Sequence, residues 1–163
     1  LKIKAVSTAA EHMQCIETAG LVRFVSILSD NPARQAVNPR KVYAVDTALA
    51  AAVSTAETVD RNKLFETMLF SHLCRESRSV CYTNEQGGCD FIASDAEGGV
   101  RCIQACYDDD PDLMQTKTDG LLWALRQTGA SRGTIVTADR NDRIDAENFE
   151  IEVIDADTFL GGY

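Results

Sequence analysis

The hydrophobic pattern of this chain of 163 residues changes period along its length, and that change limits the folds available to it. Residues 61–76 repeat apolar side chains at helical spacing, with Asp60 placed to cap the helix. Three short β-rich runs follow, separated by glycine turns short enough to join antiparallel neighbours. These runs are 79–85, 89–94 and 100–107. The sequence therefore predicts a helix followed by a three-stranded meander.

The sequence predicts further helices and strands on both sides of the helix and meander. A second helical pattern, about 113–128, stops at Gly129, and strands are expected at 133–139 and 149–155 with a polar turn (140–148) between them. A short helix closes the chain. The N-terminal elements are a helix from about Thr8, strands at 21–28 and 41–46, and an alanine-rich helix at 47–54. Together these elements predict an α/β fold, with a mixed sheet flanked by helices.

Charge is unevenly distributed. The chain carries 16 Lys and Arg against 25 Asp and Glu, a net charge of −9, which argues against indiscriminate binding to nucleic acid or anionic membranes. Residues 1–45 are nevertheless basic, with six Lys and Arg against three acids. We expect any bound nucleic acid to contact residues 1–45. The candidate contact residues are Arg23, Arg34, Arg40 and Lys41.

The six cysteines form no CxxC pair, and neither histidine joins them at zinc spacing. We interpret them as reduced, structural thiols of a cytoplasmic protein. No uncharged apolar run approaches the roughly 20 residues that a membrane span needs, so no membrane partner is expected. The acidic run 108–112 is interpreted as a solvated loop, with a cation-binding cluster as the alternative.

Carboxylates at the predicted helix–sheet contact are the main chemical feature. Glu66 lies on the helix before the meander, Asp90 opens its second strand, and Gln104 and Cys106 share a face of the third. Metal-dependent phosphodiesterases use carboxylates on neighbouring strands to hold a divalent cation, with a lysine two residues beyond the second acid. Here Gln104 stands at the position of the second acid, and Cys106 at the position of the lysine. Asp90 and Gln104 are thus candidate ligands for Mg²⁺ or Mn²⁺ in a degenerate site.

Each of these residues also has a structural interpretation. Asp90 could close its glycine turn through backbone hydrogen bonds, Glu66 could form an ordinary salt bridge, and Gln104 could be a satisfied buried amide.

Seven segments follow one another in the order of a known family. They are TAAEHMQCIETAGLV (8–22), KVYAVDTALAAAVS (41–54), FETMLFSHL (65–73), GGCDFIAS (87–94), IQACYD (103–108), LLWAL (121–125) and TIVTAD (134–139). In this order the chain resembles the C-terminal domain of prokaryotic AAA-type ATP-binding proteins, which has a PD-(D/E)xK restriction-endonuclease-like core. The resemblance implies that the family's site positions fall on Glu66, Asp90 and Gln104, and its strand-end motif on Tyr43 and Asp46.

The chain departs from the family pattern at two places. Gly88 replaces an acid, and Thr116 and Lys117 replace an Arg-Glu pair. The site lysine is also missing, as is common in the family itself. The resemblance further implies an N-terminal ATPase domain in cis, which would hold ATP. This chain itself has no P-loop motif GxxxxGK[ST].

These observations divide the chain into a partial winged-helix-like segment (1–40) and a nuclease-like domain (41–163). The leading hypothesis is a non-catalytic accessory domain that engages nucleic acid or regulates the ATPase. The alternatives are a protein–protein assembly module, which would form an oligomer, and a residual Mg²⁺- or Mn²⁺-dependent DNA nuclease.

Overall fold

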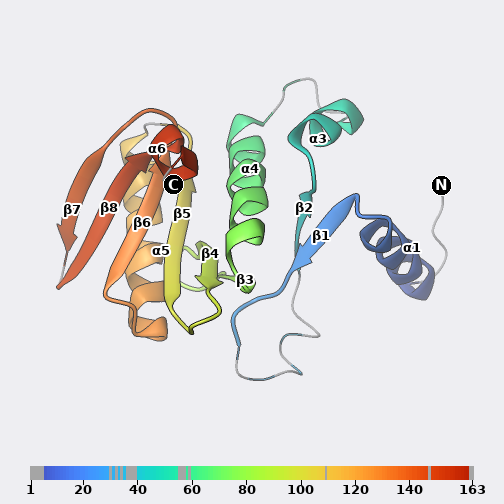
Figure 1. Ribbon diagram of the computed structural model, residues 1–163, viewed down its shortest axis with the longest axis horizontal. Coiled ribbons are helices and arrows are strands. Elements are labelled where there is room, and N and C mark those ends of the chain that lie inside the picture. The colour runs from blue at the N-terminus through green and yellow to red at the C-terminus, as the bar shows by residue number, and fades with distance from the viewer. Residues whose placement is uncertain are drawn as a thin grey trace.

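The structure is a computed structural model (Figure 1). It describes residues 6–29, 31, 33, 35, 40–54, 58, 60–108, 110–146 and 148–161. Within them, no helix is long and apolar enough to cross a membrane. All six cysteines are free thiols.

A six-stranded mixed sheet is the centre of the fold, in the order β3-β4-β5-β6-β8-β7. Its strands are β3 (Ser79–Thr83), β4 (Cys89–Ser94), β5 (Val100–Cys106), β6 (Arg132–Thr137), β7 (Asp142–Ala146) and β8 (Phe149–Asp155). The first three form an antiparallel meander, and β5, β6 and β8 run parallel. The predicted α/β fold, the meander and the mixed sheet are confirmed.

Helices cover both faces of this sheet. Leu69 and Leu73 of α4 (Arg61–Glu76) pack with Ile103 in one buried cluster, which also receives α6 (Ala156–Gly161). Leu121 and Leu125 of α5 (Pro111–Thr128) belong to a second cluster with Cys102 of β5. Because neighbouring strand residues face opposite sides, Cys102 and Ile103 assign the two clusters to opposite faces of the sheet. The protein is therefore three layers deep around β5.

Both long helices have clear end signals, of which the Asp60 cap and the Gly129 stop are predicted from sequence. The Asp60 side chain accepts a hydrogen bond from the Lys63 N–H and caps α4. Asp110 caps α5 in the same way with Pro111 as the first helical residue, so α5 begins two residues earlier than predicted. Gly129 ends α5 in the left-handed conformation, at φ 72°. Part of the acidic run 108–112 is thus a helix cap, and Asp109 lies outside the described residues.

The predicted polar turn at 140–148 is wrong, because Asp142–Ala146 form strand β7. Among the described strands, β7 pairs only with β8, at the edge of the sheet. Edge strands are commonly rich in charge, which discourages pairing with other chains, so a strand in this position lacks the apolar alternation of an inner strand. Arg143 of β7 donates to Glu150 of β8 at 2.9 Å, a cross-strand ion pair.

The N-terminal elements form a separate hairpin beside α4. They are α1 (Val6–Thr18), β1 (Val22–Val25), β2 (Lys41–Ala44) and α3 (Thr47–Val53), with β1 antiparallel to β2. Tyr43 stacks on Phe70 of α4, with ring centroids 4.3 Å apart. The β1–β2 pairing joins residues on either side of position 40, and a winged-helix-like segment ending there stays a prediction.

Candidate functional site

Five elements bring polar side chains together at the end of the meander. Each strand supplies its residue through the alternation of side chains, and each helix through a face turned to the sheet. The residues are Lys41 and Tyr43 of β2, Lys63 and Glu66 of α4, Asp90 of β4, Gln104 of β5 and Lys117 of α5. We call this group the ionic centre. Glu66, Asp90 and Gln104, which sequence analysis singled out, all belong to it.

Glu66 is almost fully buried, with 6% of its surface exposed. Its Oε1 accepts from the Lys41 ammonium at 2.8 Å and from the Tyr43 hydroxyl. Its Oε2 accepts from the Lys63 ammonium at 3.1 Å. Both carboxylate oxygens therefore have donors, which the burial of a charged group requires.

Asp90 is also buried with hydrogen-bond donors on both carboxylate oxygens, and it shares one of these donors with Glu66. Its Oδ1 accepts from Lys41 at 2.9 Å, so a single ammonium bridges the two carboxylates. Its Oδ2 accepts from the Lys117 ammonium and from the Ala105 backbone N–H, the latter at 3.1 Å. No oxygen of Glu66 or Asp90 lacks a donor.

Gln104 is completely buried and holds two strands and a helix together. Regular pairing of β4 with β5 ends at Phe91 and Ile103. Beyond that point the Gln104 Oε1 accepts the Asp90 N–H at 3.1 Å, replacing a ladder hydrogen bond. Its Nε2 donates to the carbonyls of Gly88 and Lys117, at 2.7 and 3.1 Å. Gln104 therefore acts as a satisfied structural amide that positions Asp90.

These contacts keep the centre charged. Burial disfavours ionised Asp90, but the ammonium groups of Lys117 and Lys41 outweigh it and hold the pKa of Asp90 below its ordinary value. Burial and the Asp90 carboxylate also oppose ionisation of Glu66, and the Lys41 ammonium and its hydrogen bonds outweigh both, so the pKa of Glu66 is lowered too. Burial opposes the charged form of Lys41, whereas the two carboxylates raise its pKa overall. Burial, followed by the Glu66 carboxylate, raises the pKa of Tyr43 and keeps its hydroxyl a donor.

The donor set does not fit the Mg²⁺ or Mn²⁺ that the sequence pattern suggested for Asp90 and Gln104. A divalent cation takes six or more oxygen ligands, several of them carboxylate oxygens. The four oxygens of Glu66 and Asp90 already accept from ammonium, hydroxyl or backbone donors, and the Gln104 oxygen is buried against Asp90. Among the described residues, no group of three or more His, Cys, Asp and Glu could hold a metal ion.

Cys106 stands at the position where a phosphodiesterase would have its lysine, and in this protein lysines from other elements approach the carboxylates instead. Cys106 is buried on the α5 face, and its thiol donates to the Asp108 carbonyl. Lys117 instead reaches Asp90 from α5, and Lys41 reaches it from β2. In the sequence Lys117 stands out only as a departure from the family pattern, and no local spacing signals its contact with Asp90. Lys63 had a readable signal, since it precedes Glu66 by three residues on one helix.

The proposed nucleic-acid residues do not form one group. Lys41 belongs to the ionic centre, with 27% of its side chain exposed. Arg23 and Arg40 are exposed, on β1 and just before β2. Arg34 lies outside the described residues.

Comparisons of the chain with protein-family models, with curated proteins and with solved structures find no match.

Proposed function

We propose that this chain is a non-catalytic accessory domain of restriction-endonuclease-like architecture, part of an AAA-type ATP-binding protein, and that it engages nucleic acid. In the proposed protein an N-terminal ATPase domain in cis would bind ATP, and the whole would act in the cytoplasm. The mixed sheet flanked by helices is compatible with this architecture.

One observation carries the non-catalytic part of the proposal. The carboxylates of Glu66 and Asp90 are neutralised by lysine ammonium groups, so the positions that a catalytic cation would use are taken. Activation of a water molecule would require a group with a free lone pair. Here the two carboxylates raise the pKa of Lys41 and keep it a cation, and the Tyr43 hydroxyl is committed to Glu66.

The charge of the centre supports engagement of a phosphate. Three ammonium groups face two carboxylates, which leaves one positive charge in excess. Lys63 is the accessible member, with 70% of its side chain exposed, against 27% for Lys41 and 20% for Lys117. A phosphodiester would meet Lys63 first, and the buried pairs beneath would hold that lysine in place. Phosphate contacts of this kind position nucleic acid without reading its sequence.

Fluorescence anisotropy of labelled duplex and single-stranded DNA tests the proposal, at about 50 mM and about 200 mM salt. We expect binding at low salt that weakens at high salt, and weaker binding by Lys63→Gln. Arg75→Gln is the matched control, because Arg75 is an exposed cation in the last turn of the same helix, about 18 Å along its axis from Lys63. Absence of binding at low salt, or equal losses in both variants, would contradict the proposal.

The competing hypothesis is a metal-dependent nuclease acting at the same residues. It requires a cation to displace the Lys41 ammonium from both carboxylates. Incubation of the same DNA with Mg²⁺ or Mn²⁺ distinguishes the two, since we expect the DNA to remain at full length. Cleavage by the wild type that Asp90→Asn abolishes would support the nuclease, whereas cleavage that persists in the variant indicates contamination.

A further inference from the structure

Exposed apolar side chains are concentrated at one end of the molecule. In the part of the chain that the structure describes, seven large apolar side chains are exposed, and six of them lie between residues 13 and 53. They are Met13, Ile16, Leu21, Val42, Val45 and Val53, and the seventh is Val100. Scattered exposed apolar residues are normal on protein surfaces, but a contiguous group marks an interaction surface.

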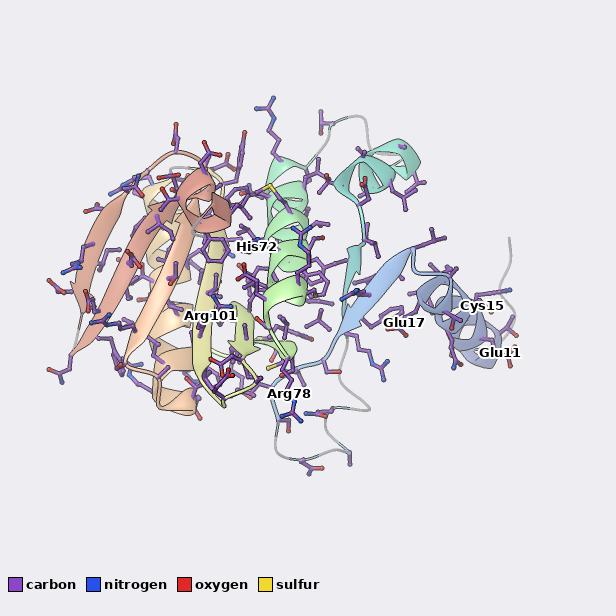
Figure 2. All side chains as sticks on the ribbon, viewed as in Figure 1. Glu11, Cys15, Glu17, His72, Arg78 and Arg101 are labelled. Carbon is purple, nitrogen blue, oxygen red and sulfur yellow. The ribbon has the colours of Figure 1, made fainter. Side chains whose placement is uncertain are left out.

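Helix α1 is part of this group and lies apart from the sheet. Figure 2 shows Glu11, Cys15 and Glu17 on α1, at the end of the molecule away from the sheet. Met13 and Ile16, three residues apart on one side of α1, are 38% and 37% exposed. An isolated helix of 13 residues is marginally stable in water, and tertiary packing of its apolar face normally stabilises it.

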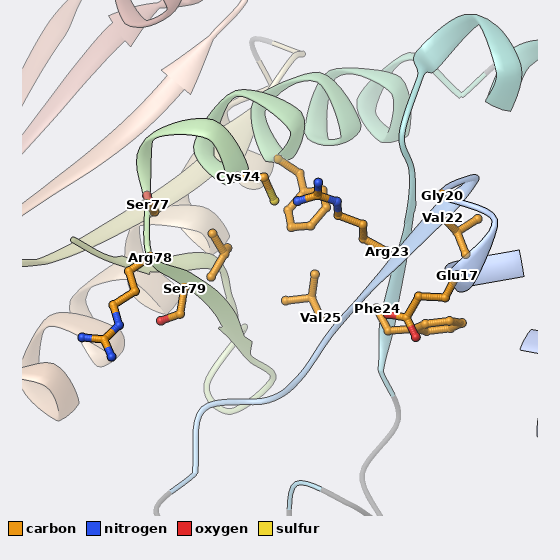
Figure 3. A pocket seen from close by; sticks show the side chains of 12 residues that line it. Glu17, Gly20, Val22, Arg23, Phe24, Val25, Cys74, Ser77, Arg78 and Ser79 are labelled. Atoms are coloured by element: carbon orange, nitrogen blue, oxygen red, sulfur yellow. The ribbon is translucent and has the colours of Figure 1, made fainter. Parts of the chain in front are cut away.

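The outer face of the β1–β2 hairpin is the second part. Val22 pairs with Ala44 and Phe24 with Val42, so these four residues share one face of the hairpin. The opposite face carries Tyr43, which packs on α4. Figure 3 shows Val22 and Phe24 on the side of β1 away from Arg23 and Val25. Val42 at the centre of the outer face is 46% exposed, so α1 of the same chain does not cover it.

The two parts have complementary charge. The described side chains of α1 include two acids, Glu11 and Glu17, and no lysine or arginine. The hairpin strands contain no acid, and exposed Arg40 directly precedes β2, two residues before Val42 and so on the outer side, whereas Arg23 and Lys41 lie on the face that carries Tyr43. Each chain therefore carries an acidic helix with exposed apolar side chains and an apolar outer hairpin face with a cation, Arg40, at its edge. A second copy offers both complements at once.

We propose that the chain forms a reciprocal dimer, in which α1 of each copy packs across the outer β1–β2 face of the other. Met13 and Ile16 then cover Phe24 and Val42 of the partner copy, and Glu17 approaches its Arg40. Such a contact is isologous and closes at two copies. The dimer contact uses no residue of the ionic centre, so the dimer can fail while nucleic-acid binding persists, and the reverse.

Sedimentation velocity over about a hundredfold range of protein concentration tests the dimer. We expect the wild type to dimerise and Ile16→Glu to weaken the dimer by about tenfold or more, because the new carboxylate would be buried against Phe24 and Val42. Val100→Glu is the matched control, an exposed apolar residue outside the surface, and we expect it to dimerise normally. A monomeric wild type across the range would overturn the proposal, as would equal behaviour of the two variants.

A charge exchange tests the geometry itself. Glu17→Arg and Arg40→Glu are each expected to weaken the dimer, and the double variant is expected to recover it, because the ion pair is restored in reverse. Both residues are exposed, so circular dichroism should show an unchanged fold. Failure of the double variant to recover, or growth into open polymers in place of a closed dimer, would contradict reciprocal packing.

Discussion

Asp90 shows how a buried carboxylate can be stable in a sheet without a metal ion. Its two oxygens accept from two lysines and one backbone N–H, and the lysines come from elements on either side of β4. Charge-assisted hydrogen bonds of this kind are stronger than neutral ones. Removal of one partner from such a group is costly because the remaining charges stay buried.

We expect Asp90→Asn to lower the free energy of unfolding by about 3 kcal/mol, since Lys117 and Lys41 lose their shared counter-charge. Chemical denaturation followed by circular dichroism measures it. Asp142→Asn is the control, because Asp142 pairs with Arg140 at the exposed edge, and we expect no measurable change there. A loss no larger than that of the control would show that the ionic centre contributes little.

The pH dependence of stability follows from the same residues. Glu66 and Asp90 have pKa values below their ordinary ones, so their contribution is complete above about pH 4.5 and is lost as pH falls through the lowered values. Burial raises the pKa of Cys81 to about 11 and also raises that of Cys102, so their contribution is complete below about pH 8 and is lost as pH rises. The contribution of Lys41, whose pKa is raised, is lost at still higher pH.

Denaturation midpoints across the pH range should therefore be nearly level from about pH 5 to about pH 8 and fall on both sides. Asp90→Asn should reduce the fall on the acid side, because one of the groups responsible is gone. A steep change between about pH 5 and about pH 7 would contradict this assignment, since none of the shifts described here begins in that range.

Sequence identified the carboxylates of the centre but only part of its lysines. Glu66 and Asp90 could be singled out because a charged residue at a predicted helix–sheet contact needs a partner. The partners Lys41 and Lys117 lie 49 and 27 residues from Asp90, and only the fold determines which distant cation approaches. Gln104 could be placed on the correct face by the period of two, whereas its three hydrogen bonds depend on the end of the β4–β5 ladder.

Among the elements, α5 and the turn before β4 are in unusually close contact. A Cβ added to Gly120 would lie 2.0 Å from the Gly88 carbonyl oxygen. This close approach lets Gln104 reach carbonyls of both the turn and the helix, and Lys117, one turn earlier on α5, reach Asp90. The glycine is therefore needed for backbone contact, although glycine weakens a helix interior.

We expect Gly120→Ala to lower the free energy of unfolding by about 3 kcal/mol, in spite of the roughly 1 kcal/mol by which alanine favours a helix. The control is Gly129→Ala, where the added Cβ meets no atom within 4 Å. That change costs only the left-handed backbone strain, about 1 kcal/mol. Thermal unfolding compares the two, and a stabilising Gly120→Ala would show that the helix and turn can separate freely.

Elements were more predictable where their residues are buried. The bounds of α4, β4 and β8 agree with the predicted 61–76, 89–94 and 149–155, because periodicity and turn residues indicate the same ends there. β7 was missed because it has one neighbouring strand and exposed charges, so pairing with β8 supplies what its own sequence lacks.

For the whole molecule, the net charge of −9 opposes the approach of nucleic acid, and only local excess charge can favour it. The ionic centre offers few phosphate contacts, so we expect log K for duplex DNA to fall with log salt with a slope of about −2. Lys63→Gln should reduce that slope by about 1. A slope several times steeper in the wild type would indicate a wider basic surface than Lys63 and its neighbours.

The most direct test of the central claim is a carboxylate ¹³C NMR titration of the chain with Mg²⁺ at neutral pH. If the lysine ammonium groups hold Glu66 and Asp90, both carboxylate resonances should keep their positions as Mg²⁺ is added, and Lys41→Met should make them responsive. Saturable shifts of both resonances in the wild type would mean that a cation displaces Lys41. That result would contradict a non-catalytic centre and support the nuclease.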